Sequence, residues 1–155
     1  MESGHLPDSA ISASTSYDGN HIPQFGRLNK IPASGKAGAW CAKSNDVKQW
    51  LQVSFGRQTT VTKVATQGRY KSNQWVTSYT LSYSVDGAHW VWYRLSNGHI
   101  KVWLTCNGIS GKSCSIRNQT MHLTFNIHYI SSRIFENIIA KIYLFRQADF
   151  LGHKL

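Results

Sequence analysis

Hydrophobic and polar residues alternate along several short stretches of this chain, which is the pattern of strands that bury one face. The clearest stretch is YTLSYSV (79–85), in which every second residue is large and hydrophobic. Asp86-Gly87, a strong hairpin signal, follows directly, and HWVWYR (89–94) is suited to the return strand. The pattern therefore predicts an antiparallel hairpin in the middle of the chain.

Weaker stretches of the same kind occur earlier. Residues 10–14 alternate briefly, QWLQVSF (49–55) alternates more clearly, and TTVTKVAT (59–66) fits a half-buried strand with one irregularity. Residues 15–38 are rich in Ser, Gly, Asn and Pro, which favours long loops. Since no stretch before residue 95 has the spacing of a long helix, this part of the chain is predicted to be all-β.

The character of the sequence changes after Leu95. Residues 96–120 mix Gly, Asn and Ser with two cysteines, and residues 121–145 are rich in isoleucine. LTFNIHYI (123–130) alternates as a strand does. The spacing of a helical face is found instead in Ile134, Ile138, Ile142 and Phe145. We therefore expect one strand, followed either by a second strand or by a short helix.

Tryptophan is concentrated in the strand-rich part of the chain, where five of the six tryptophans lie between Trp40 and Trp92. Large aromatic side chains are highly buried on average and contribute much of the core of a domain. We predict a structural core, rather than ligand contacts, for four of them: Trp40, Trp50, Trp75 and Trp90. The neighbouring Cys41 is predicted to be a buried thiol.

Composition narrows the functional classes. A chain of 155 residues suits one domain with a sizeable core, and the formal charge of +10 favours anionic partners. The basic residues are scattered and no recognition helix is evident, so nucleic-acid binding is not favoured. An enzyme is not predicted either. The seven histidines lack metal-ligand spacing, and there is no nucleophile motif, phosphate-binding glycine loop or marked carboxylate pair.

The beginning of the chain, its apolar runs and its cysteines give information on the cellular compartment of the protein. The opening MESGHLPDSA lacks the basic start and apolar stretch of a signal peptide, and no apolar run approaches the length of about 20 residues that spans a membrane. With three cysteines, at least one thiol has no partner within the chain. Cys106 and Cys114 are close enough in sequence to pair across a short loop, and two reduced thiols are an equally good interpretation.

Several motifs follow one another in a fixed order over residues 1–94. They are MESGHLPDSAISASTSYDGN, AWCAKSNDVKQWLQVSFG, VTKVATQGR, WVTSYTLSYSVDG and HWVWYR. In order and spacing they resemble the discoidin domain, also called the coagulation factor V/VIII type C domain. The resemblance implies an all-β fold, a distorted jelly-roll β-sandwich, and an extracellular or cell-surface location.

The chain departs from this family after Arg94. The family's closing strands and its terminal cysteine pair are not recognisable. We therefore expect residues 1–94 to be a discoidin-type domain that is incomplete by itself, and residues 95–155 to be a divergent tail. Two origins of the tail stay open: it completes the sandwich, or it derives from an alternative exon or a misread gene boundary.

The resemblance also implies that ligand-binding loops project from one end of the sandwich. Segments 17–27, 29–38 and 69–74 fit this role because each is polar or rich in Gly and Pro, and each carries apolar or aromatic residues beside a base. Such a surface suits acidic phospholipid headgroups, and equally a glycan or a matrix or cell-surface protein. The candidate residues are Tyr17, Asn20, His21, Ile22, Phe25, Lys30, Ile31, Arg69, Tyr70 and Lys71.

Some of these residues have a structural interpretation of equal weight. Tyr17, Phe25 and Tyr70 are also suited to pinning their loops onto the sandwich. In collagen-binding relatives, the arginine at the position of Arg69 belongs to the binding surface. For Arg27 we favour the role of a structural ion-pair partner.

The leading hypothesis is a non-catalytic extracellular binding or cell-adhesion module that recognises phospholipid, glycan or matrix protein. No cofactor is predicted, although family members sometimes hold a structural calcium, for which Asp18 and Asp46 are candidates. Two alternatives remain: a carbohydrate-binding appendage of a larger enzyme, and a truncated product without function.

Overall fold

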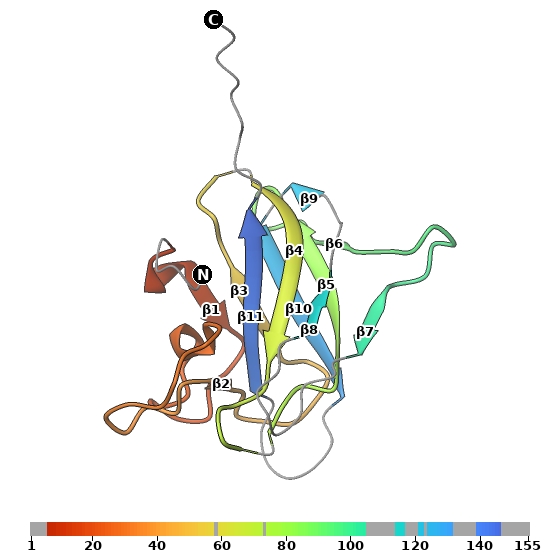
Figure 1. Ribbon diagram of the computed structural model, residues 1–155. Helices are drawn as coiled ribbons and strands as arrows, with labels where there is room; N and C mark the ends of the chain where they lie inside the picture. Colours follow the sequence, from red (N-terminus) through yellow and green to blue (C-terminus); the bar gives the residue numbers. More distant parts are fainter. Residues whose placement is uncertain are drawn as a thin grey trace, which may run out of the picture.

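Two antiparallel sheets packed face to face form a β-sandwich (Figure 1). A computed structural model describes residues 6–57, 59–72, 74–104, 114–116, 121–122, 124–131 and 139–146. Within these ranges the helices are two short 3-10 turns, η1 (Asp8–Ala10) and η2 (Pro23–Gly26). The predicted all-β fold is therefore confirmed.

Each sheet combines strands from distant parts of the sequence. The six-stranded sheet has the order β1 (Ile11–Ala13), β3 (Trp50–Val53), β10 (Thr124–Ser131), β5 (Ser78–Ser84) and β6 (Val91–Trp92), with β7 (Val102–Leu104) also paired to β5. The five-stranded sheet has the order β2 (Trp40–Cys41), β11 (Ile139–Arg146), β4 (Thr60–Gln67) and β8 (Cys114–Ile116), with β9 (Met121–His122) also paired to β4.

The predicted central hairpin is present as β5 and β6, in which Tyr83 pairs with Val91. Asp86 organises the turn between them. Its Oδ1 accepts hydrogen bonds from the backbone N–H groups of Ala88 and His89, both at 2.8 Å, and Gly87 has a φ of 75°, which glycine adopts without strain. The Asp-Gly pair thus shapes this turn as expected.

The residues after Arg94 contribute strands to the interior of both sheets. β10 lies between β3 and β5, with Ile127 paired to both Leu51 and Leu81. β11 lies between β2 and β4. The helical alternative for this region is therefore wrong over residues 139–146. The physical reason is that β4 leaves a row of backbone groups that a neighbouring strand can satisfy and a helix cannot.

The core lies between the sheets and is built from the inward residues of the strands. Its largest fully buried side chains belong to Trp40, Leu51, Val61, Tyr79 and Leu81. The Trp40 indole N–H donates a 2.8 Å hydrogen bond to the backbone carbonyl of Thr15, so its polar atom is satisfied.

The prediction of four core tryptophans needs correction. Trp40 is fully buried, but Trp50, Trp75 and Trp90 are partly exposed and lie outside the core cluster. On β3 the reason is strand alternation: Leu51 and Val53 point inward, so Trp50 points outward. The second core tryptophan is Trp103 on β7, whose ring stacks on Tyr79 with centroids 5.9 Å apart.

Candidate functional site

The three predicted loops lie together at one end of the sandwich, the lower end in Figure 1. We call residues 17–38 and 67–77 the loop end. Hydrogen bonds connect its parts: the Asn29 N–H donates to the Gln67 side chain at 2.9 Å, and the Ala37 N–H donates to the Asn20 carbonyl at 3.0 Å. The loops therefore form one surface rather than three separate ones.

Loop 29–38 is the most projecting of the three and is stiffened by its own turn. The backbones of Ala33 and Lys36 exchange two hydrogen bonds of 3.2 and 2.9 Å. Between them Ser34 and Gly35 have φ values of 48° and 77°, the left-handed pair typical of a type I′ hairpin turn. The loop is thus a small hairpin with a defined shape.

Ile31 occupies the exposed side of this hairpin, with 60% of its surface accessible. Lys30 and Lys36, which precede and follow it in the sequence, are also exposed. Gly38 fixes the backbone beneath, because a Cβ at this position would lie 2.7 Å from the Ile31 carbonyl carbon and from the Pro32 nitrogen. The loop therefore presents an exposed apolar side chain and two exposed lysines on a backbone that Gly38 constrains.

The first loop combines an exposed aromatic ring with a short polar network. Tyr17 is 52% exposed and meets the His21 ring edge-on, with centroids 5.6 Å apart. His21 Nδ1 donates to Asp18 Oδ1 at 2.6 Å, and this hydrogen bond is the main reason that the pKa of Asp18 is lowered. Asn20 is exposed beside them.

Phe25 and Ile22 belong to the base of the first loop rather than to its tip. Both are partly buried around η2. The ammonium group of Lys36 lies 5.3 Å from the centroid of the Phe25 ring, within the range of a cation–π contact. Phe25 therefore ties the second loop to the first, in line with the pinning interpretation.

In the third loop, Arg69 holds the two ends of the loop together. Its guanidinium donates to the Gln74 side-chain oxygen at 2.9 Å, and its backbone N–H donates to the Gln74 carbonyl at 3.0 Å. Tyr70 is 43% exposed, and the Lys71 ammonium lies 5.4 Å from its ring centroid. Tyr70 and Lys71 thus face outward, while Arg69 is partly buried.

Arg27 has the structural role predicted for it. It is buried and donates to Asp8 Oδ1 at 2.6 Å and to the Leu6 carbonyl at 2.8 Å. An open groove of about 440 Å³ lies here, lined by Leu6, Pro7, Asp8, Arg27, Leu28, Asn29 and Lys30. Asp8 compensates the guanidinium charge of Arg27 in this groove.

Cys41 lies beneath the loop end as the predicted buried thiol, with 1% of its surface exposed. Burial raises its pKa to about 12, and the charges of Arg69 and Asp18 are both close enough to affect it. The Tyr17 N–H donates to the Cys41 carbonyl, and the Cys41 N–H donates to the His21 carbonyl. Of the predicted Cys106–Cys114 alternatives, Cys106 lies outside the described residues, so both stay predictions.

The two calcium candidates are engaged with hydrogen-bond donors. Both oxygens of Asp46 accept from the Gln49 amide at 3.1 Å, and one also accepts from the Lys48 N–H. Asp18 accepts from Asn20 and His21. Among the described residues no group of three His, Cys, Asp or Glu is placed to hold a metal ion. Donors that point at these carboxylates do not fit a calcium site, which takes oxygen ligands.

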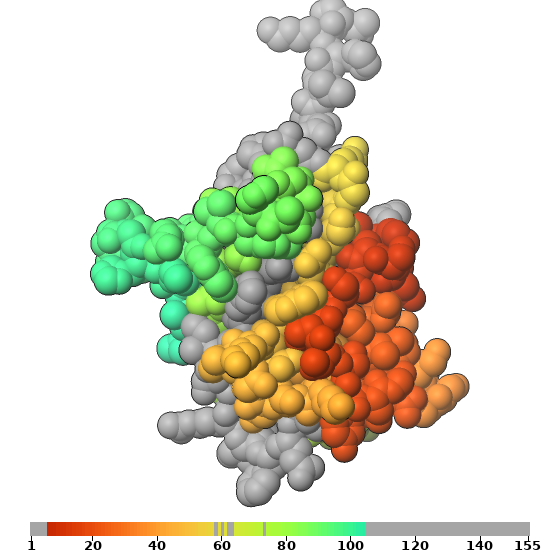
Figure 2. Space-filling view, turned by 180° about the vertical axis from the view of Figure 1, so that it is seen from behind, coloured from red at the N-terminus to blue at the C-terminus, as the bar shows by residue number. Residues whose placement is uncertain are grey.

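The ten predicted ligand-binding residues therefore fall into two groups, one exposed and one partly buried. Six face solvent: Tyr17, Asn20, Lys30, Ile31, Tyr70 and Lys71. Four are partly buried and support the others: His21, Ile22, Phe25 and Arg69. Sequence reasoning missed the exposed Lys36 and also Val47, which is 62% exposed. The loop of Val47 lies at the lower end of the molecule in Figure 2. A lone valine among the polar residues of SNDVKQ was the available signal.

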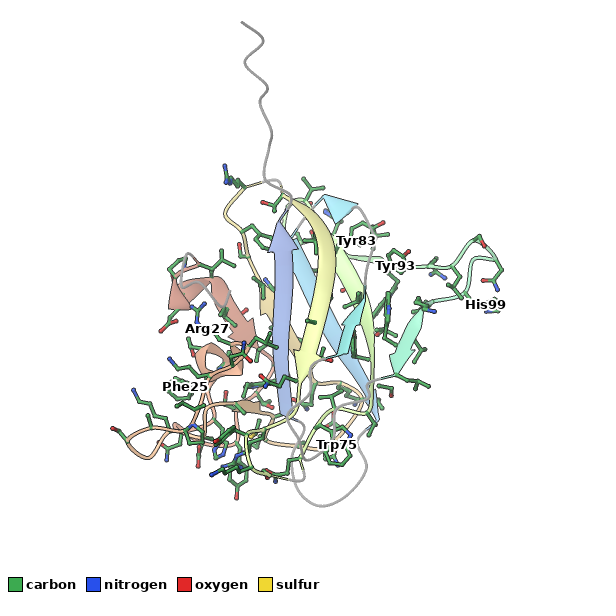
Figure 3. The ribbon with its side chains drawn as sticks, viewed as in Figure 1. Phe25, Arg27, Trp75, Tyr83, Tyr93 and His99 are labelled. Atoms are coloured by element: carbon green, nitrogen blue, oxygen red, sulfur yellow. The ribbon has the colours of Figure 1, made fainter. Side chains whose placement is uncertain are left out.

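Figure 3 shows how the labelled side chains are distributed. Phe25 lies at the lower left and Trp75 at the lower end, whereas His99 lies on the projecting segment at the right. Among the described residues, no helix is long and apolar enough to cross a bilayer.

The loop end is a polar surface on which a few apolar side chains are exposed, and partly buried residues support it.

Comparison with protein families and known sequences gives a consistent result. A family model for the F5/8 type C domain matches residues 10–133, and so extends beyond residue 94. Lactadherin of Rattus norvegicus is 40% identical over 99 residues, which are 61% of this chain and 23% of that protein. The human EGF-like repeat and discoidin I-like domain-containing protein 3 is 39% identical over 99 residues, 61% of this chain and 21% of its own length. The match thus spans less than a quarter of these relatives.

Solved structures share the fold at lower sequence identity. Discoidin II of Dictyostelium discoideum superposes with a TM-score of 0.78 at 22% identity, over 89% of this chain and 55% of that one. A CBM32 module of Clostridium perfringens, solved in complex with GalNAc-β-1,3-galactose, gives 0.62 at 18% identity, over 90% and 98% of the two chains. The family 32 CBM of NanJ from the same organism, in complex with galactose, gives 0.63 at 16% identity, over 90% and 96%.

Proposed function

The chain belongs to the F5/8 type C domain family of non-catalytic binding modules, and on that premise we propose that its loop end binds membrane surfaces rich in acidic phospholipid. An extracellular or cell-surface location is part of the same proposal. The observation that carries it is the exposed Ile31 in a stiff loop that also carries the exposed Lys30 and Lys36.

This arrangement matches the two components of a bilayer interface. An aliphatic side chain gains free energy by entering the acyl boundary, and lysines beside it meet acidic headgroups. Tyr70 with Lys71 repeats the combination on the third loop. An amphipathic ring of this kind favours the depth of the headgroups.

The expected strength follows from the same features. Each lysine near an acidic membrane contributes about 1 kcal/mol, so Lys30, Lys36 and Lys71 together supply about 3 kcal/mol. Burying a complete Ile side chain adds about 2 kcal/mol. Because more than half of this sum is electrostatic, binding should be moderate and should weaken strongly as salt is raised.

Vesicle sedimentation tests the proposal. We expect the protein to bind vesicles that contain phosphatidylserine, and to bind phosphatidylcholine vesicles weakly. Ile31→Ser should weaken binding about tenfold, since roughly 1.5 kcal/mol of apolar transfer is lost. Val85→Ser is the matched control, because Val85 is 72% exposed on the β5–β6 turn, away from the loop end. Equal binding of both variants, or equal binding to neutral vesicles, would refute the proposal.

A second candidate ligand is a galactose-containing glycan. It is favoured by the two neighbours solved with such sugars and by the exposed Tyr17 ring beside Asn20 and Asp18. An aromatic face with adjacent hydrogen-bonding groups suits a sugar ring. Isothermal titration with galactose distinguishes the two candidates: heat that disappears in Tyr17→Ala, but persists in Ile31→Ser, would favour the glycan.

A further inference from the structure

One edge of the six-stranded sheet breaks the pattern of the strands beside it. Residues that alternate with the core positions on the neighbouring strands are mostly polar, as in Ser12, Gln52, Ser78, Thr80, Ser82 and Ser84, with Trp50 as the exception, and the four on β5 are buried. On β7, Trp103 turns into the core, and Val102 and Leu104 turn outward with 44% and 80% exposure. β7 is paired with β5, where Ser78 and Thr80 are buried, yet these two apolar side chains are exposed. Their exposure on an edge strand therefore requires an explanation.

The same edge carries a projecting hairpin, residues 93–101, between β6 and β7. Its strands meet at the Arg94–Ile100 bridge, and the Arg94 guanidinium closes the turn by donating to the Gly98 carbonyl at 2.8 Å. Figure 2 shows this segment standing out from the body of the molecule. We call residues 91–104 the edge arm.

The edge arm is firmly attached despite its projection. The Tyr93 ring packs on Trp103 with centroids 5.2 Å apart, and Trp103 stacks on the buried Tyr79. The backbone N–H of Tyr93 also donates to the Leu81 carbonyl at 2.9 Å. Its exposed residues are therefore held in place by the core.

Apolar surface and positive charge are both concentrated on the edge arm. It holds five of the ten large hydrophobic residues that are exposed in the described part of the chain: Val91, Leu95, Ile100, Val102 and Leu104. Its basic residues are Arg94, His99 and Lys101, and the segment contains no Asp or Glu. An occupant should thus be both apolar and anionic.

We propose that the edge arm is a second contact surface for bilayers rich in acidic phospholipid, separate from the loop end. Charge complementarity selects an anionic occupant, and the aliphatic side chains exclude a purely polar one such as a sulfated glycan. Exposed apolar residues occur on both strands of the arm, Val91 on β6 and Val102 and Leu104 on β7, and also in its turn, at Leu95. A deformable bilayer can cover both sides of a projecting hairpin, whereas a rigid protein would need a matching groove.

The position of the edge arm gives this surface a distinct consequence. Loop 29–38 and the edge arm project from opposite sides of the sandwich (Figure 1), so one flat bilayer does not contact both. If the proposed function of the loop end also holds, the domain can bridge two bilayers. Bridging rests on both surfaces, but binding by the edge arm alone does not.

Direct binding is measured first, in the Ile31→Ser background, with vesicles of phosphatidylserine and phosphatidylcholine at low salt. Val102→Thr with Leu104→Thr removes apolar surface but keeps side chains that suit a strand, and should weaken the remaining binding about tenfold. Arg94→Gln with Lys101→Gln should weaken it about fivefold per charge. Val85→Thr is the control. Thermal melting verifies that each variant folds.

Unchanged residual binding in both double variants would overturn the edge-arm proposal, whatever the loop end does. Conversely, the edge-arm variants could weaken vesicle binding while Ile31→Ser in the native background leaves it unchanged. That result would refute the proposed function of the loop end and leave the edge-arm proposal standing. A dimer that Val102→Thr with Leu104→Thr converts to monomer in sedimentation velocity would show that a second copy covers the arm, and would also overturn the proposal. Vesicle turbidity then tests bridging, which either set of variants should abolish.

Discussion

Gly38 is the position where we expect a very small substitution to affect the loop end most. In Gly38→Ala the new Cβ would lie 2.7 Å from the Ile31 carbonyl carbon and the Pro32 nitrogen, whereas ordinary contact begins at 3.4 Å. The backbone of Ile31 would have to move by about 0.7 Å, the difference between these distances. Such a shift displaces the residue proposed to enter the bilayer.

The free-energy cost has two parts. Gly38 has a φ of 62°, and a Cβ in this left-handed region costs roughly 1 kcal/mol. Overlap with packed backbone adds about 1–3 kcal/mol. We therefore expect the free energy of unfolding to fall by about 2–4 kcal/mol, and vesicle binding to weaken as well.

Gly35→Ala is the matched control within the same loop. Gly35 has a φ of 77°, but nothing lies within 4 Å of the Cβ that alanine would add. The free energy of unfolding of this variant should fall only by the cost of a Cβ in the left-handed region, about 1 kcal/mol, and vesicle binding should be retained. Urea denaturation and vesicle sedimentation measure both quantities. Equal stability and equal binding of the two variants would show that the close approach of Gly38 to Ile31 does not constrain the loop.

Three other expectations concern the rest of the molecule. A chain that ends at Arg94 lacks β10, the strand between β3 and β5, so it should not melt cooperatively; a sharp calorimetric transition would contradict this. With Cys106 and Cys114 replaced by Ser, the Cys41 thiol, buried and with a pKa raised to about 12, should react with a disulfide reagent only after denaturation, and rapid native labelling would argue against burial. His89 pairs with Asp86 at 2.6 Å, which raises the pKa of His89 above its ordinary 6.5 and lowers that of Asp86 below 3.8. The raised pKa of His89 stabilises the folded state fully below pH 6.5, and this contribution is lost as the pH rises through the pKa of His89 in the folded protein. The lowered pKa of Asp86 stabilises the folded state above pH 3.8, and this contribution is lost as the pH falls through the pKa of Asp86 in the folded protein. An NMR titration of His89 should therefore show a raised pKa that returns toward 6.5 in Asp86→Asn, and an unchanged value in that variant would refute the pairing.

The fold was predictable where its signals are local. Alternation in β5 and the Asp86-Gly87 turn depend on neighbouring residues, so the hairpin could be inferred directly. The outward orientation of Trp50 and the strand conformation of β11 could not. Both depend on which face of the strand meets the core and on which strands are adjacent, and these are long-range properties of the sheet.

The candidate site was predictable in composition but not in detail. The polar segments around Tyr17, Ile31 and Tyr70 do lie at one end of the sandwich. The sequence did not reveal that Arg69 is engaged with Gln74 or that Lys36 approaches Phe25. These pairings arise from how the loops pack on each other, which leaves no periodic signal in the chain.

The central position of β10 and β11 has a consequence for biosynthesis. A ribosome delivers β3, β4 and β5 well before residue 124, the start of β10, and at about 5–20 residues per second this interval lasts several seconds. During that time the strands that will flank β10 and β11 carry unpaired edges and exposed apolar faces, which are prone to aggregate. The nascent chain can close its sheets only when β10 and β11 emerge, so the maturation of this domain should depend on protection by chaperones until β11 has been synthesised.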